Sequence, residues 1–246
     1  MGTTKEKEII IKIQDLHKSF GSNVVLNGFS MTVYKGDSVV ILDKSGSGKS
    51  VMIKCLVGLL RPDSGYIEIM GHDPTILSQK ELNELRSQIG FLFQGSALYD
   101  SMTVRENLEF PLRGHKAWLS QKDTRVKQAL ESVGLLDAID LMPSELSGGM
   151  KRRIALARAI MLRPQTIIYD EPTTGLDPIT SKEITLLIQR IQQEYDATSL
   201  IITHDIDFAK AIATKIILLI DGTNYASGTA QELEASTDPK IKAFFK

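Results

Sequence analysis

The chain has 246 residues, enough for a sizeable core, and its 42% hydrophobic content is typical of a globular protein and argues against disorder. A formal net charge of −1 gives no overall basic field, so composition lends no support to nucleic-acid binding. The single cysteine, Cys55, excludes an internal disulfide framework, and we expect it to be a small buried side chain. No apolar run reaches the roughly 18 residues of a membrane span, so we expect any membrane role to go through a partner.

In chain order, the first hundred residues favour strands over helices. Apolar alternation and turn residues predict strands over 9–16, 24–26, 29–33, 38–42, 66–70 and 89–93. We expect the first to be an edge strand, with Asn27-Gly28 as a turn, and short strands with tight turns favour an antiparallel sheet. Helices are predicted from Val51 to about Leu60 and after the capping box of Ser78 and Glu81.

The pattern changes between Ser101 and Met161, where helical periodicity replaces the strand signals. We interpret 101–161 as a helical subdomain inserted into an α/β core of about 1–100 and 162–246, so that 1–246 is a single domain. From Gln165 onward, strands and helices alternate. A tight hairpin turn is predicted at Asp221-Gly222, and a capping box of Thr229 and Glu232 is expected to open the last helix. The predicted fold is therefore α/β, with a mostly parallel sheet covered on both faces, an antiparallel N-terminal subdomain and ligands at the carboxyl ends of the strands.

The stretch from Asp43 to Ser50 (DKSGSGKS) carries the first functional signal. Strand, glycine-rich turn and helix together bind nucleotide phosphates, because backbone N–H groups and the helix N-terminus favour the anion. Lys49 would neutralise the outer phosphates, and the Ser50 hydroxyl would ligate Mg²⁺. The alternative is a surface turn that binds nothing. The predicted nucleotide contacts are Ser45, Gly46, Ser47, Gly48, Lys49, Ser50 and Val51.

Asp43 departs from the usual loop pattern G-x-x-x-x-G-K-[ST], because it stands where the first glycine belongs. Aspartate tolerates unusual backbone angles better than most residues, so the loop can still form. Its carboxylate would lie near an anionic triphosphate. We expect this repulsion to weaken ATP binding by about ten- to a hundredfold and to shrink as salt rises.

Two adjacent carboxylates, Asp170 and Glu171, follow the predicted strand over 166–169. Carboxylates at a strand tip are costly unless a cation compensates them, and a Mg²⁺ ion held by Asp170 would do so. Glu171 would then act as the general base for an attacking water. A solvated acidic turn is the alternative. Phosphate loop first and carboxylates later is the order of a phosphate-loop NTPase.

A Leu-Ser-Gly-Gly-Met stretch over 146–150 precedes a predicted helix. Here the chain resembles the ATP-binding subunits of ABC transporters, whose signature is Leu-Ser-Gly-Gly-Gln. The resemblance implies a head-to-tail homodimer in which three signature residues contact ATP held by the other protomer: Ser147, Gly148 and Gly149. A plain serine N-cap is the alternative. For the next three residues we expect a solvated basic face: Lys151, Arg152 and Arg153.

Further motifs of the family follow in the expected order, and the resemblance covers about 9–235. Phe20 matches the aromatic residue that stacks on adenine, although a core position is its alternative. Gln94 matches the glutamine that reaches Mg²⁺, Asp177 matches a loop at the dimer interface, and His204 matches the histidine that hydrogen-bonds the γ-phosphate. The resemblance thus implies catalysis by Lys49, Glu171 and His204, and Mg²⁺ ligation by Ser50, Gln94 and Asp170.

A finer resemblance rests on residues 93–104 together with Met150. They look like the bacterial lipid-transport branch associated with MCE proteins, the Mla/Mkl-type ATPases. This implies transport of a phospholipid-type lipid, separate transmembrane permease subunits, an MCE-type lipid-binding partner and a place on the cytoplasmic face of the inner membrane. An apolar permease groove would include Leu98, Tyr99 and Met102, with core packing as the alternative.

Two other functions stay open. A soluble ABC ATPase acting on nucleic acid or ribosomes usually carries paired cassettes or a long coiled-coil insert, and the sequence has neither. A nucleotide-binding regulatory module with weak hydrolysis is kept because of Asp43. We therefore expect an ATP-hydrolysing transporter subunit without a nucleic-acid partner.

Overall fold

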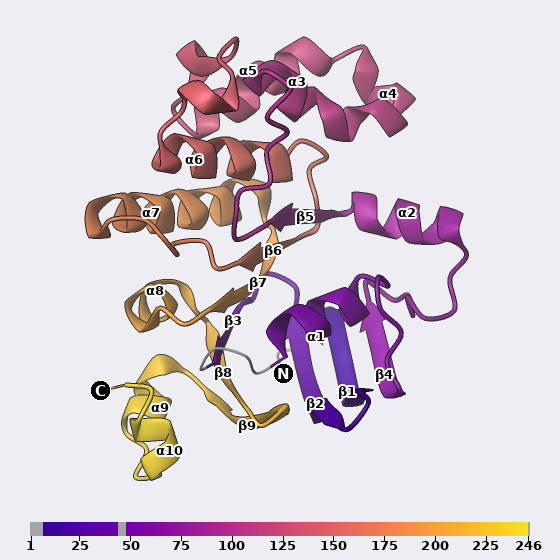
Figure 1. Cartoon of the computed structure of the whole chain (residues 1–246), viewed down its shortest axis with the longest axis vertical. Helices are drawn as coiled ribbons and strands as arrows, with labels where there is room; N and C mark the ends of the chain where they lie inside the picture. Colours follow the sequence, from indigo (N-terminus) through magenta and orange to yellow (C-terminus); the bar gives the residue numbers. More distant parts are fainter. Residues whose placement is uncertain (1–6, 44–47, 246) are drawn as a thin grey trace, which may run out of the picture. The chain divides into compact units, whose positions relative to one another are not determined.

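The structure, a computed structural model, describes residues 7–43 and 48–245 (Figure 1). The chain forms two compact units. The first comprises the residues up to Arg86 and those from Thr198 onward, and the second is Ser87–Ala197.

The first unit begins with a three-stranded antiparallel sheet, in which β1 (Ile9–Phe20) lies between β2 (Asn23–Tyr34) and β4 (Ser64–Ile69) (Figure 1). Side chains alternate between the two faces of a strand, so one face of each is apolar and buried. Leu16 of β1 and Phe29 of β2 are fully buried on this account. The antiparallel character of the N-terminal sheet is as predicted.

The other sheet strands of the first unit follow the order β7 (Thr198–Thr203), β3 (Ser38–Asp43), β8 (Lys215–Ile220) and β9 (Thr223–Gly228). β3 pairs in parallel with β7 and β8, and β8 pairs with β9 through the hairpin predicted at Asp221-Gly222. Every residue of β3 and β7 is buried, as in parallel strands covered on both faces.

Helices of the first unit connect and flank these strands. α2 opens with the predicted capping box of Ser78 and Glu81, and α9 opens with that of Thr229 and Glu232. The helices are α1 (Lys49–Leu56), α2 (Gln79–Ser87, whose last residue belongs to the second unit), α8 (Ile206–Ile212), α9 (Ala230–Glu234) and α10 (Pro239–Lys242).

In the second unit, the parallel strands β5 (Ile89–Leu92) and β6 (Thr166–Asp170) accompany a set of helices. Every element described between Ser101 and Met161 is helical. α6 packs against β5, α3, α5 and α7 and so forms the centre of this unit. The helices are α3 (Val104–Glu109), η1 (Phe110–Gly114), α4 (Lys116–Leu119), α5 (Lys122–Ser132), η2 (Leu136–Ala138), η3 (Pro143–Glu145), α6 (Gly148–Ala159) and α7 (Pro178–Tyr195).

Two expectations about the first sheet were wrong. β1 is central, because the distant strand β4 pairs with its second edge. The segment with the predicted turn at Asn27-Gly28 is one continuous strand, β2. Gly28 (φ +82°) lies opposite the step from Leu16 to His17, where the register shifts, so a β-bulge accommodates its backbone without ending the strand.

Cys55 is buried in α1, as expected, and burial raises the pKa of its thiol to about 11. The thiolate is therefore scarce at neutral pH. Over the described residues, no helix is long and apolar enough to cross a membrane.

Gly65 tests the packing of β4 on β1. Its φ is +98°, and an added Cβ would lie 2.4 Å from the Asp15 carbonyl oxygen and 2.7 Å from the Leu16 Cα. We expect Gly65→Ala to lower the free energy of unfolding by roughly 3 kcal/mol or more, because backbone strain and a backbone clash add.

The control is Gly36→Ala, because Gly36 has a similar φ of +77° but no atom within 4 Å of the added Cβ. It should cost only about 1–2 kcal/mol. Denaturant unfolding of both variants measures the difference, and equal losses would contradict the crowding at Gly65.

Candidate functional site

The start of α1 in the first unit has a local geometry that suits phosphate binding. Gly48 precedes α1 with φ +101°, and a Cβ there would lie 2.8 Å from the Val25 carbonyl oxygen, so only glycine fits. Among the residues that the structure describes, no side chain caps α1, and the first turn of α1 contains no acidic residue. The N-terminal N–H groups of α1 are therefore suited to an anion.

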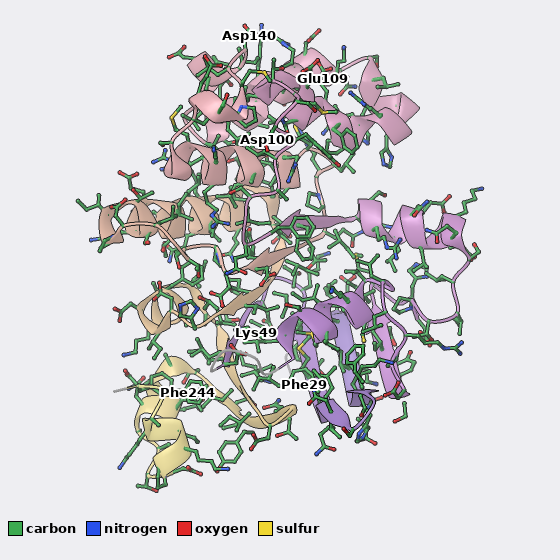
Figure 2. The ribbon with its side chains drawn as sticks, viewed as in Figure 1. Phe29, Lys49, Asp100, Glu109, Asp140 and Phe244 are labelled. Carbon is green, nitrogen blue, oxygen red and sulfur yellow. The ribbon has the colours of Figure 1, made fainter. Side chains whose placement is uncertain are left out.

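Lys49 opens α1 (Figure 2). Its ammonium group forms an ion pair with the carboxylate of Asp43 at the end of β3. The Asp43 side chain is fully buried, and that of Lys49 is nearly so. A buried carboxylate is costly without a compensating cation or hydrogen bonds, so this pair offsets part of the cost of Asp43. The lysine predicted to neutralise phosphates is thus engaged by a carboxylate of its own chain.

For the predicted weakening of ATP binding, the structure suggests a different cause from direct repulsion by Asp43. As the last residue of β3, Asp43 pairs in register with Leu219 of β8, so its own backbone conformation does not demand glycine. Its carboxylate pairs with Lys49 and would therefore compete with a phosphate for that ammonium group. Three predicted phosphate contacts lie outside the described residues: Ser45, Gly46 and Ser47.

The remaining predicted residues of the first unit lie on three elements. His204 follows β7 directly, and β7 is the neighbour of β3, with Leu42 level with Thr203. Since both strands are parallel, His204 and Asp43, the last residue of β3, lie at the same edge of this sheet. Ser50 and Val51 belong to the first turn of α1. Phe20 ends β1 and is 51% exposed, so it is not a core side chain.

In the second unit, Asp170 ends β6, and Glu171 follows with an unusual backbone. Glu171 has φ +50° and is only 6% exposed. Its carboxylate accepts a hydrogen bond of 2.9 Å from the Thr174 hydroxyl. A buried carboxylate on a left-handed, non-glycine residue is a strained arrangement of the kind found at functional sites, and it excludes the alternative of a solvated acidic turn for Glu171.

Gln94 lies in an exposed turn that follows β5. The turn closes through a 2.9 Å hydrogen bond from the Ser96 N–H to the Phe93 carbonyl. Ser96 is buried, whereas Gln94 and Gly95 are exposed. The base of the turn is therefore fixed in the protein while Gln94 stands on its exposed part.

The signature stretch forms the start of α6. The Ser147 hydroxyl accepts from the Met150 N–H at 3.2 Å, so Ser147 is the N-cap, and Gly148 and Gly149 form the first turn. Asp177 caps α7 in the same way and also accepts from the Thr180 hydroxyl. That hydroxyl, together with the Thr180 N–H, lowers the pKa of the Asp177 carboxyl.

The expectation of a solvated face at 151–153 was wrong for Arg152, which is only 4% exposed. Its guanidinium donates to the carbonyls of Phe93 and Thr174. Burial lowers its pKa, and the charge of Asp170 opposes this shift. Sequence reasoning missed the burial of Arg152, although the helical period places Arg152 next to the buried residues Leu156 and Ala159. It placed Thr174 in the loop that ends at Asp177 but did not predict that Thr174 contacts Glu171 and Arg152.

The predicted residues fall in both units, the first carrying Phe20, Lys49 and His204 and the second Gln94, Asp170, Glu171, Ser147 and Asp177. Across the part of the chain that the structure describes, no three His, Cys, Asp or Glu side chains cluster as a metal site. The oxygen donors predicted for Mg²⁺ suit that ion, which usually takes one or two protein ligands together with substrate phosphates and water. Ser50 and Asp170 fit this chemistry.

Comparison with known proteins places these motifs in context. The ABC transporter family matches residues 26–174. The intermembrane phospholipid transport system ATP-binding protein MlaF of Haemophilus influenzae is 39% identical over 96% of this chain and 90% of its own length. The probable ribonucleotide transport ATP-binding protein mkl of Mycobacterium tuberculosis is 40% identical over 96% of this chain and 66% of its own.

The methionine import ATP-binding protein MetN of Rhizobium johnstonii is 38% identical over 95% of this chain. The chain spans 65% of the length of that relative and 66% of that of mkl, slightly less than two thirds in each case.

Solved structures agree in fold. The structure of cbiO1 from Clostridium perfringens, described as part of the ABC transporter complex cbiONQ, has a TM-score of 0.86 and 30% identity, covering 98% of this chain and 96% of that one. A dimeric post-hydrolysis structure of the ATP-binding cassette MJ0796, bound to ADP and Pi, has a TM-score of 0.79 and 31% identity, covering 90% and 99%.

The ion pair between Asp43 and Lys49 predicts that Asp43→Asn will tighten binding of Mg-ATP about tenfold, because Lys49 becomes available to phosphate. A buried pair is little screened, so the gain should be the same at about 0.05 M and 1 M salt. Nucleotide titration by fluorescence measures it.

Asp37→Asn is the matched control, since it removes a partly buried carboxylate just before the other end of β3. It should leave the affinity unchanged. If Asp43→Asn raises the affinity for Mg-ATP only at low salt, direct repulsion between Asp43 and the phosphates is the cause. If the affinity does not rise at all, Asp43 does not compete with phosphate for Lys49.

Proposed function

The chain belongs to the ABC transporter family, and on that premise we propose that it powers transport of a phospholipid-type lipid between bacterial membranes by hydrolysing ATP. It is an ATPase of the cassette type with the phosphate-loop NTPase fold. The observation that carries the lipid substrate is the match to the phospholipid-transport protein MlaF, at 39% identity over 96% of this chain and 90% of that protein.

In the proposed reaction, Lys49 and His204 stabilise the charge that develops on the transferred phosphoryl group. Mg²⁺ would be held by Ser50, Asp170 and Gln94 and would supply charge neutralisation at the phosphate oxygens. Glu171 takes the proton of the attacking water. Its burial and its hydrogen bond from Thr174 support this role, because both hold the carboxylate in a defined position.

The proposed assembly is a head-to-tail homodimer in which Ser147, Gly148 and Gly149 act on the nucleotide of the partner protomer. The start of α6 supports this role, since a serine and two glycines leave little side-chain bulk over the helix N-terminus. The similarity to the dimeric MJ0796 cassette agrees with it.

A permease contact is proposed at an exposed aromatic pair of the second unit. The rings of Tyr99 and Phe110 lie 4.6 Å apart, and both are exposed. The amide of buried Asn107 bonds to the backbone of Tyr99, Met102 and Thr103 and so fixes the segment beneath. A rigid apolar patch of this kind suits a transmembrane partner, and an MCE-type lipid-binding protein would complete the complex.

The methionine-import relative supports a second candidate, an amino-acid transporter subunit. Purification of the complex from native membranes, followed by identification of co-purified proteins and lipids by mass spectrometry, separates the two. A permease together with an MCE-type protein and enriched phospholipid supports the proposal. A permease with a methionine-binding protein would overturn the lipid assignment.

The role of Glu171 is tested by Glu171→Gln. The amide cannot accept the proton of the attacking water, so kcat should fall by about a hundredfold or more while the affinity for Mg-ATP is kept. Steady-state ATPase assays and nucleotide titration measure the two effects. Near-normal turnover in this variant would rule out Glu171 as the general base, and a wild-type chain that binds ATP without turnover would favour the regulatory module.

A further inference from the structure

We propose that Arg152 is a positioning residue that holds the Glu171 loop and the Gln94 turn onto helix α6. The inference rests on the proposed function, since it concerns the groups that would act in ATP hydrolysis. The hydrogen-bond acceptors of Arg152 on which the inference rests, Phe93 and Thr174, lie in the second unit, as does Arg152 itself.

The guanidinium of Arg152 joins two separate loops. One terminal nitrogen donates to the Phe93 carbonyl at 2.9 Å, and the other donates to the Thr174 carbonyl at 3.3 Å. Phe93 immediately precedes Gln94, and its carbonyl is also the acceptor that closes the turn. One buried side chain of α6 therefore fixes both loops at once.

Through Thr174 the connection reaches the predicted general base. Thr174 accepts from Arg152 through its carbonyl and donates through its hydroxyl to the Glu171 carboxylate at 2.9 Å. The backbone N–H of Thr174 also donates to the Glu171 carbonyl, at 3.4 Å. Movement of Thr174 would thus be passed to Glu171, whose backbone is strained (φ +50°) and depends on its surroundings.

A second arginine of α6 holds the Gln94 turn from its other end. Arg158 donates to the carbonyls of Ser96 and Ala97 at 2.9 and 2.7 Å. Both acceptor residues have positive φ, +62° and +48°, so the turn is strained where Arg158 holds it. Gln94 and Gly95 lie between the carbonyls that accept from Arg152 and from Arg158. Of these two arginines, Arg152 is the one with a described hydrogen bond to the Glu171 loop.

A contribution to folding stability does not explain well why an arginine is buried at position 152. Its Nε is buried and has no hydrogen-bond partner among the described residues, and its charge is buried as well. Replacing a buried cation by an apolar side chain of similar volume is often neutral or stabilising. A methionine would fill the same space, so the presence of an arginine is better explained by its hydrogen bonds to the two loops.

The test compares Arg152→Met, Arg152→Lys, Arg158→Met and Arg153→Met. Arg153→Met is the matched control, because Arg153 lies on the same turn of α6 but bonds the Val133 carbonyl and Glu183. For Arg152→Met we expect kcat for ATP hydrolysis to fall about ten- to a hundredfold with unchanged Kd for Mg-ATP and unchanged Tm. Arg152→Lys should recover part of kcat, and Arg153→Met should match the wild type.

Hydrogen exchange of the backbone amides gives a readout that needs no catalysis. Arg152→Met should speed exchange both at Ser96 and at Thr174 and Leu176, Arg158→Met only at Ser96, and Arg153→Met at none of them. Unchanged exchange at both loops in Arg152→Met overturns the inference, as does a fall in kcat that only follows a loss of folded protein. A wild-type chain without ATPase activity overturns the proposed function, and the exchange pattern still decides the role of Arg152.

Discussion

The ion pair between Asp43 and Lys49 constrains how the first unit can bind phosphate. The carboxylate of Asp43 is fully buried at the end of β3, and Lys49 begins helix α1. The N-terminus of α1 otherwise suits an anion, because Gly48 packs closely against β2 and the first turn contains no acidic residue. A phosphate that binds there must take Lys49 away from Asp43 and leave a carboxylate to be compensated by other groups. The attraction between Asp43 and Lys49 therefore compensates the buried carboxylate in the free chain and, through the same atoms, opposes phosphate binding.

In the second unit the important acidic residue is Glu171, and its proposed role as general base requires a fixed position. Glu171 has a strained backbone and a buried carboxylate, which accepts a hydrogen bond from the nearby Thr174 hydroxyl. Arg152 of α6 adds to this support by donating to the carbonyl of Thr174. Because it also reaches Phe93, the loops that follow two different strands, β5 and β6, share one support on one helix.

Much of this arrangement follows from the sequence, because periodicity and turn chemistry are local. The helical stretch between 101 and 161, the hairpin at Asp221-Gly222 and the capping boxes at Ser78 and Thr229 needed only neighbouring residues to be predicted. The central place of β1 depends on pairing with β4, some fifty residues away, and alternation cannot reveal a partner at that distance. The burial of Arg152 has the same cause, since its acceptors are carbonyls, which every residue carries and no sequence pattern marks.

Asp43 and Arg152 would act on different steps of the proposed ATPase cycle. Asp43 pairs with Lys49 in the free chain, so in our proposal its charge would affect the stability of the nucleotide complex, and the chemical step would depend on Glu171. Arg152 donates to backbone carbonyls of its own chain, so its proposed effect is on the geometry of Glu171 as the general base. Weak binding and fast chemistry are compatible in such a protein, because a KM raised by Asp43 need not lower kcat. The affinity for ATP and the rate of hydrolysis can therefore be changed independently, each through a single charged residue.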